Sequence, residues 1–368
     1  MYRNTWMEID LDAVKYNVKK AIELSGRKVI AVVKADAYGC GDQMIAKAAI
    51  EAGAFMLAVS SLDEAVILRK EGFTEDILVL GHVDAENIPV MIENGISATI
   101  YSKQFAAQLT AYDLHGLKAH LKVDTGMNRI GFKSQAELNE AAERLEHAGA
   151  NLTGIFTHFC CTDSDPAMTA KQFERFSAMV KGTGRDFALI HCDNSDATLT
   201  FKDDLSNACR YGVSMYGVSP YVKDLKHPVS FYTRVFMIKE VAAGETVGYG
   251  ATYTAKENEW IGTMPVGYAD GLIRANQGRR VYVNGEEAEI VGRVCMDQTM
   301  IRLSKPCEEG SLVEIFGPHI AIEDMANDLH TIPYEILCLI SDRVTRVYKE
   351  QGTTVREHNI RLESVENQ

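Results

Sequence analysis

The chain lacks the features that mark several classes of protein. None of its eight cysteines forms a CxxC pair, which argues against zinc ribbons and thioredoxin-type sites. No apolar run reaches the roughly 18 residues of a membrane span, and the start MYRNTWMEID has no signal-peptide core. We therefore expect a cytoplasmic protein with reduced cysteines, no metal site and no membrane partner.

The chain also has fewer basic residues than acidic ones. The chain has 38 lysines and arginines against 51 acidic residues, and its formal net charge is -13. The basic residues are scattered, so nucleic acid is not an expected partner. The 368 residues are 46% hydrophobic, which is enough for two buried cores.

Residues 1–228 alternate short apolar runs with helix-like stretches, a pattern typical of a (β/α)8 barrel of the TIM type. The strands are apolar on both faces, as buried parallel strands are. A further strand over 5–10 precedes them and is expected to pair outside the barrel, with the second domain. The eight candidate strands are Val29–Val33, Phe55–Val59, Ile77–Leu80, Ala98–Tyr101, Leu117–Val123, Leu152–Thr157, Phe187–Ile190 and Tyr211–Tyr216.

Residues 229–368 have a different texture, in which short apolar runs such as Phe231–Val241 are separated by glycine, proline and charged turns. This pattern predicts a mainly antiparallel β domain. The dipeptide Asn284-Gly285 between two apolar runs predicts a hairpin. The polar tail from Glu350 is predicted to fray.

Lys34 is the first candidate catalytic residue, because it directly follows the apolar run Val29–Val33. That position is the C-terminal mouth of the predicted barrel, where barrel active sites lie. Burial lowers the pKa of a lysine, and a neutral amine reacts with a carbonyl cofactor. A solvated lysine at a strand end is the alternative on position alone.

The stretch AVVKADAYGCG, Ala31 to Gly41, resembles the cofactor-lysine motif of the alanine racemase family. The resemblance implies that Lys34 is linked to pyridoxal phosphate and serves as one of two catalytic bases. It also implies that Tyr38 contacts the cofactor phosphate. The later motifs follow in the family's order and cover nearly the whole chain.

KVDTGMNRIGF, Lys122 to Phe132, is a strong second match. The resemblance implies that Arg129 orients the substrate carboxylate, for which its planar fork is suited. In some family members the lysine at the position of Lys122 is carbamylated and pairs with this arginine. A surface ion pair is the alternative for Arg129.

FTHF and HCDNSDA supply further matches. The resemblance places His158 beside the catalytic tyrosine, and makes Ser195 a hydroxyl donor to the cofactor phosphate. His191 and Asn194 support them. A buried core histidine and a helix cap are the alternatives for His158 and for the Asn194–Ser195 pair.

RYGVSMYG, Arg210 to Gly217, bears most directly on mechanism. In the family the arginine bonds the pyridine nitrogen of the cofactor, and Gly212 and Val213 offer backbone N–H groups to the phosphate. Arginine keeps its protons, so the nitrogen stays unprotonated and the ring is a weaker electron sink. Decarboxylases of this fold place a carboxylate there, so Arg210 favours a racemase.

In the second domain the long stretch from Gly244 to Gly271 resembles the family around its second base, here Tyr249, with Tyr268 in support. VCMDQTM matches the motif in which the backbone of Met296 binds the substrate carboxylate beside Asp297. Without the other motifs, Tyr249 would be interpreted as an aromatic residue in a turn next to a strand.

The resemblance implies an L/D-alanine racemase that supplies D-alanine for peptidoglycan, and a homodimer in which Tyr249 comes from the partner subunit. One position departs from the family. ISDRVTR, Ile340 to Arg346, has Asp342 where a pocket-narrowing, phosphate-binding tyrosine is usual. This change suggests serine as an alternative or additional substrate, or neutral drift. A barrel-only pyridoxal-phosphate carrier is a less favoured alternative.

Overall fold

The computed structural model describes residues 2–366, and the chain divides into two compact units. One unit comprises Val14–Ala37 and Asp42–Lys226. The other comprises Tyr38–Gly41 together with the described parts of 1–13 and 227–368.

The first unit is built around a closed barrel of eight parallel strands, in which the last strand pairs with the first. Nearly all strand residues are buried, because helices cover the outside and side chains fill the inside. An apolar layer that includes Ile30, Met56 and Leu189 fills part of the interior. The strands are β2 (Lys28–Val32), β3 (Met56–Val59), β4 (Ile77–Val79), β5 (Ile96–Ile100), β6 (Lys118–Lys122), β7 (Asn151–Phe156), β8 (Leu189–His191) and β9 (Ala208–Tyr211).

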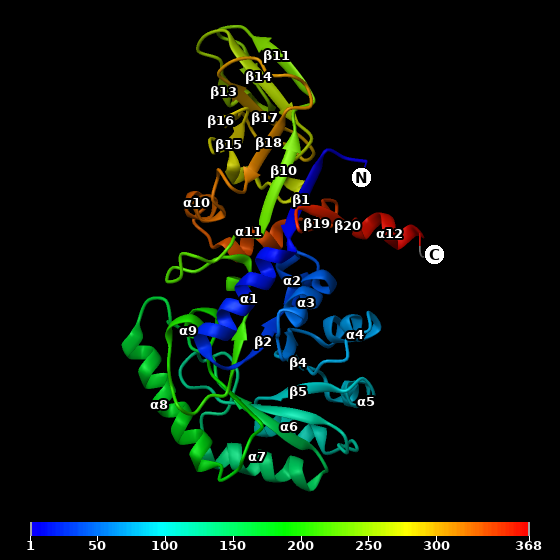
Figure 1. The fold of residues 1–368 in the computed structure, drawn as a ribbon, viewed down its shortest axis with the longest axis vertical. Coiled ribbons are helices and arrows are strands. Elements are labelled where there is room, and N and C mark those ends of the chain that lie inside the picture. The colour runs from blue at the N-terminus through cyan, green and yellow to red at the C-terminus, as the bar shows by residue number, and fades with distance from the viewer. Residues whose placement is uncertain (1, 367–368) are drawn as a thin grey trace. The chain divides into compact units, whose positions relative to one another are not determined.

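Helices alternate with these strands, and Figure 1 shows α4, α5, α7 and α8 at the periphery of the unit. Several begin at side-chain caps, such as Ser61 for α4 and Ser134 for α7. The helices are α1 (Leu11–Ser25), α2 (Lys34–Gly39), α3 (Asp42–Glu51), α4 (Leu62–Lys70), η1 (Ala85–Asn87), α5 (Ile88–Glu93), α6 (Lys103–Leu109), α7 (Gln135–His147), α8 (Pro166–Gly182), α9 (Ser195–Thr200) and η2 (Val213–Tyr216).

The second unit contains a ten-stranded sheet in the order β11-β14-β17-β16-β15-β18-β10-β1-β19-β20, and a small β12-β13 pair. The strand β1 (Thr5–Asp10) pairs antiparallel with β10 and parallel with β19, side by side in Figure 1. All other pairs in the sheet are antiparallel. The remaining strands are β10 (Val229–Arg234), β11 (Met237–Val241), β12 (Thr246–Val247), β13 (Tyr253–Thr254), β14 (Glu259–Met264), β15 (Arg280–Val283), β16 (Glu286–Val291), β17 (Thr299–Leu303), β18 (Leu312–Phe316), β19 (Thr345–Glu350) and β20 (Thr353–His358).

Short helices occupy the connections of this unit. They are η3 (Tyr249–Ala251), η4 (Tyr268–Asp270), η5 (Arg274–Asn276), α10 (Ile322–Asp328), α11 (Pro333–Leu339) and α12 (Ile360–Glu366). No helix within residues 2–366 is long and apolar enough to cross a bilayer.

The structure confirms the predicted fold class of a barrel plus a mainly antiparallel domain. The hairpin at Asn284-Gly285 is confirmed too, since it joins β15 to β16 with both residues at positive φ. Two other predictions are wrong.

The run 211–216 is not a strand. The eighth barrel strand lies earlier, at Ala208–Tyr211, and the rest of the run forms the buried turn η2. Gly212 departs from strand geometry at φ -124 and ψ -98, which ends the strand. Apolarity marked this segment as buried but did not distinguish a strand from a turn.

The run Phe231–Val241 forms parts of two strands, with a break at residues 235–236. The tail from Glu350 does not fray at once, because β20 pairs antiparallel with β19 and α12 follows. Gln351 and Gly352 adopt positive φ and make the tight turn between the two strands. Backbone hydrogen bonds therefore order this polar segment.

Candidate functional site

In the barrel unit, the predicted site residues gather at the C-terminal ends of the strands. Lys34 follows β2 after a single residue. The strand β9 lies beside β2, with Ala31 opposite Tyr211, so Arg210 lies on the strand next to the one that leads to Lys34. The fold thus brings together segments some 175 positions apart, at the face where barrel enzymes hold their sites.

An unusual backbone turn follows Lys34. Four consecutive residues, Ala35 to Tyr38, have φ between 50 and 58 and Gly39 follows at 79, so α2 is a left-handed turn made mostly of residues other than glycine. Such a turn costs about 1–2 kcal/mol per residue. Glu64 holds its start by accepting a hydrogen bond from the Ala35 N–H at 2.7 Å. Lys34 is the residue that leads into this strained turn at the barrel mouth.

Arg210 is the centre of a buried hydrogen-bond network. Its Nη2 donates to the carbonyls of Thr157 at 2.8 Å and Cys192 at 3.0 Å, and lies 3.3 Å from Nδ1 of His158. Its Nη1 reaches Nδ1 of His191 at 2.7 Å. Burial lowers the pKa of Arg210 to about 10, so the group remains a cation at neutral pH.

His158, at the end of β7, is kept neutral by these surroundings. Burial, and then the positive charge of Arg210, holds the pKa of His158 well below its usual value, and Lys34 adds to the effect. Because arginine only donates, Nδ1 of His158 accepts from Arg210 and the proton of this histidine lies on Nε2.

Lys122 ends β6 and is buried. Burial, followed by the charge of Arg210, lowers the pKa of Lys122 to about 7, and its Nζ donates to the Val123 carbonyl at 2.9 Å. The next loop presents Arg129 to solvent. The Asp124 carboxylate shapes that loop by accepting from the N–H groups of Gly126 and Asn128, each at 3.0 Å.

Ser195 and Gly212 meet at the ends of β8 and β9. The Gly212 N–H donates to Oγ of Ser195 at 2.9 Å, and Val213 is buried beside them. Asn194 caps α9 by accepting from the Ala197 N–H at 3.0 Å. A hydroxyl and backbone N–H groups therefore converge near the buried cation Arg210.

One cluster of potential metal ligands, Cys192, Asp193 and Asp203, lies among the described residues. Arg27 already occupies it, because its guanidinium forms ion pairs with both carboxylates. The cluster is therefore a buried ion-pair network.

In the second unit, Tyr38 lies in the segment 38–41, which is bound to strand β19. Arg346 donates to the Gly39 carbonyl at 3.0 and 2.9 Å, and the Tyr348 hydroxyl donates to the Cys40 carbonyl at 2.9 Å. Burial raises the pKa of Tyr38, so its phenol stays protonated and available as a donor.

Tyr249 lies on the connection between β12 and β13, flanked by Gly248 and Gly250 at positive φ. Its side chain is 72% exposed, high for a tyrosine. A large aromatic side chain that is exposed on a turn between two glycines is more typical of a binding surface than of a core.

Four other predicted residues cluster in this unit. The N–H of Tyr268 donates to the Cys295 carbonyl at 3.0 Å, and that of Ala269 to the Met296 carbonyl at 3.1 Å. Arg343 joins them by bonding Asp297 at 2.7 Å. Next to Arg343, Asp342 is exposed and has no ion pair within the described residues.

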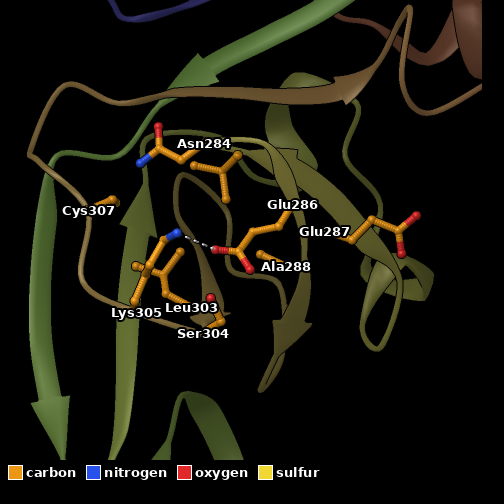
Figure 2. Close-up of a pocket in the computed structure, with 9 residues that line it drawn as sticks. Asn284, Glu286, Glu287, Ala288, Leu303, Ser304, Lys305 and Cys307 are labelled. Atoms are coloured by element: carbon orange, nitrogen blue, oxygen red, sulfur yellow. Dashed lines mark ion pairs between the residues drawn. The ribbon is translucent and has the colours of Figure 1, made fainter.

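Sequence reasoning missed His120, whose ring reaches His191 inside the barrel. A histidine within the otherwise apolar strand β6 was the available signal. Two surface hollows contain none of the predicted residues: one on the barrel unit includes Arg69, Asp76 and Lys118. Figure 2 shows the other, beside the β15–β16 hairpin, with Lys305 and Glu286 3.7 Å apart.

Comparison with known proteins gives consistent matches. The family described as "Alanine racemase, N-terminal domain" matches residues 9–220, and "Alanine racemase, C-terminal domain" matches residues 228–348. Alanine racemase of Anoxybacillus flavithermus is 42% identical, over 97% of this chain and 98% of the relative. Alanine racemase 1 of Bacillus subtilis is 40% identical over 97% and 96%. The crystal structure of alanine racemase from Bacillus anthracis with bound L-Ala-P superposes with a TM-score of 0.94 at 39% identity, covering 99% of both chains.

Proposed function

Because this chain belongs to the alanine racemase family, we propose that it is a pyridoxal-phosphate enzyme that interconverts L- and D-alanine. The observation that carries the proposal is the barrel mouth, where Lys34, the buried Arg210 cation and the Ser195–Gly212 pair meet. The enzyme works in the cytoplasm, and its product, D-alanine, is used for peptidoglycan.

The donors at the mouth fit the cofactor. Lys34 would hold its carbonyl carbon, Arg210 its ring nitrogen, and Ser195, Gly212 and Val213 its phosphate. Pyridoxal phosphate, when bound, weakens the Cα–H bond of the attached amino acid by drawing off its electrons. Arg210 keeps its own protons, so it leaves the ring nitrogen unprotonated and limits side reactions.

Racemization needs one proton acceptor on each face of the substrate Cα. Lys34 serves the D-isomer, and the partner subunit's Tyr249 serves the L-isomer. His158 carries its proton on Nε2, from which it donates a hydrogen bond to the oxygen of that tyrosine. The exposure of Tyr249 within one chain suits a residue that acts in another subunit's site.

The substrate carboxylate is bound by charge and backbone together. Arg129 offers its planar guanidinium from the exposed loop after β6. The backbone N–H of Met296 supplies a second donor, and Asp297 and Tyr268 support that segment.

Two alternatives are weaker. A barrel-only carrier of pyridoxal phosphate has no second domain, whereas residues 228–348 match the family's C-terminal domain. A decarboxylase of this fold places a carboxylate at the ring nitrogen, where this chain has Arg210.

The direct test replaces Lys34. Purified enzyme is expected to racemize L-alanine, followed by optical rotation, and Lys34→Ala to lose activity roughly 10²-fold or more with loss of the cofactor's covalent link. Lys28→Ala is the matched control, because Lys28 is an exposed lysine at the other end of β2. A Lys34→Ala enzyme as active as Lys28→Ala would contradict the assignment.

Serine is a second substrate favoured by one observation. Asp342 is exposed and without an ion pair within residues 2–366, at the position where the family usually has a tyrosine. The smaller side chain leaves space, and its carboxylate accepts a hydrogen bond from a substrate hydroxyl. A dual alanine and serine racemase follows if Asp342 faces the substrate.

The serine proposal is tested with two variants at one position. Asp342→Tyr is expected to reduce kcat/KM for L-serine by about tenfold while sparing L-alanine, the range for losing a hydrogen bond and space. Asp342→Asn keeps the size and removes the charge, so it separates the two effects. Negligible serine turnover by the unaltered enzyme would end the proposal.

A further inference from the structure

Two histidines and Arg210 form a hydrogen-bonded chain across the barrel interior. Nδ1 of His120 on β6 lies 2.9 Å from Nε2 of His191 on β8. Nδ1 of His191 lies 2.7 Å from Nη1 of Arg210 on β9. The three residues are 1%, 0% and 4% exposed, so water does not substitute for these contacts.

The direction of each bond follows from the chemistry of arginine. A guanidinium donates and never accepts, so Nδ1 of His191 accepts and carries no proton. A neutral His191 then has its proton on Nε2 and donates it to Nδ1 of His120. Burial lowers the pKa of His120 to about 4 and holds that of His191 well below its usual value, so both rings stay neutral.

Packing holds both rings in place. Phe156 stacks on His191 with ring centres 4.7 Å apart and planes 7° apart. Gly154 makes room for the other ring, because a Cβ at this position would lie 2.6 Å from two atoms of His120. Neither ring is free to turn away from the shared hydrogen bond.

We propose that His120 is a positioning residue for Arg210. By accepting from Nε2 of His191, it holds His191 in the tautomer whose lone pair faces the guanidinium. Without that acceptor, the Nε2 proton would be buried without a partner. The other tautomer of His191 would remove the proton from Nε2. It would then place an N–H group on Nδ1, facing Arg210, which has no lone pair to accept a hydrogen bond.

The consequence reaches the cofactor, and this step rests on the proposed function. The carbonyls of Thr157 and Cys192 hold Nη2 of Arg210, while Nη1 is held by the backbone carbonyl of His191 at 3.1 Å and, more closely, by Nδ1 of His191 at 2.7 Å. Losing the closer of the two Nη1 contacts shifts the guanidinium relative to the place where the proposal puts the ring nitrogen. His120 thus acts on cofactor binding through two intervening side chains.

The test compares two variants of the holoenzyme. Asparagine at 120 offers an acceptor oxygen at nearly the place of Nδ1, whereas leucine fills similar space without an acceptor. His120→Leu is expected to weaken pyridoxal-phosphate affinity and lower kcat, each by roughly 5- to 100-fold, with little change in KM. His120→Asn is expected to restore both to within about threefold of the original.

Nitrogen-15 NMR of the histidine rings supplies a readout that a structural role would not move. The unaltered enzyme is expected to show His120 and His191 each protonated on Nε2 alone. A proton on Nδ1 of His191 would overturn the proposal, as would a His120→Leu enzyme with unchanged cofactor affinity. If His120→Leu does not fold, two measurements still test the proposal. They are the protonation of the His120 and His191 rings and the affinity of His120→Asn for pyridoxal phosphate.

The same measurements separate this inference from the proposed function. An enzyme that binds pyridoxal phosphate but does not racemize alanine refutes the function, while ring protonation and cofactor affinity still decide the role of His120. An active racemase whose His191 is protonated on Nδ1 refutes the inference alone.

Discussion

At the scale of single residues, burial decides which groups carry charge. Arg210 stays a cation because its pKa remains near 10 even when enclosed, while His120 and His158 are driven neutral beside it. Each unit of pKa shift corresponds to about 1.4 kcal/mol between the two protonation states. Arg210 is therefore a fixed cation with neutral histidines as acceptors beside it.

Among the buried groups of this region, Lys122 is the one whose protonation state changes near neutral pH. With a pKa near 7, about half of its side chains are neutral at pH 7 and more above it. A neutral amine adds CO2 and releases a proton, which would give a carbamate facing Arg129. We expect labelled CO2 to give a carbon-13 NMR signal that strengthens as pH rises through 7.

The control for that prediction is Lys118 on the same strand. Lys118 is partly exposed, and its Nζ is held in an ion pair with Asp76 at 2.5 Å. The signal is expected to vanish in Lys122→Gln and to persist in Lys118→Gln. A signal that survives Lys122→Gln would place the carbamate elsewhere.

At the scale of elements, the left-handed turn after β2 depends on the helix that follows β3. Glu64 near the start of α4 accepts from the N–H groups of Ala35 at 2.7 Å, Ser60 at 2.7 Å and Ser61 at 3.1 Å. One carboxylate therefore caps its own helix and anchors the strained turn that carries Lys34.

Replacing Glu64 with alanine is expected to reduce the free energy of unfolding by about 2–4 kcal/mol, since three backbone donors lose a charged acceptor. Denaturant unfolding measures the loss. Asp63→Ala is the neighbouring control, because Asp63 is exposed on the same turn and accepts no such bonds, so about 0.5 kcal/mol is expected. Equal losses in the two variants would show that Glu64 does not anchor the turn.

At the scale of the whole molecule, the proposal requires two chains for each complete site. Lys34 lies at the barrel mouth and Tyr249 on the exposed connection after β12, and the proposal pairs each with the partner's copy of the other. A symmetric dimer of this kind contains two such sites, each using one barrel unit and one second unit.

Mixing two inactive variants tests this arrangement. Lys34→Ala and Tyr249→Phe, unfolded and refolded together in equal amounts, are expected to recover about a quarter of full activity. Half the dimers would be mixed, and each would hold one unaltered site and one doubly altered site. No recovery, with mixed dimers shown by mass, would mean that each site is completed within one chain.

The sequence by itself determined the fold class. Apolar runs of strand length between helix-like stretches specified the barrel, because buried parallel strands exclude polar residues from both faces. Turn chemistry specified the hairpin at Asn284-Gly285, where both residues tolerate positive φ. The motifs also named Lys34, Arg210 and Tyr249, since local sequence carries residue identity.

Only the tertiary structure decided which groups surround these residues. The chain from His120 through His191 to Arg210 joins three strands, and no local pattern records which side chains meet inside a barrel. The same holds for β20, whose polar residues predicted disorder until pairing with β19 supplied its hydrogen bonds. Contacts between segments that are distant in the sequence determine which side chains are buried and which partners they have. Burial and partners in turn determine the charge and tautomer of each buried group.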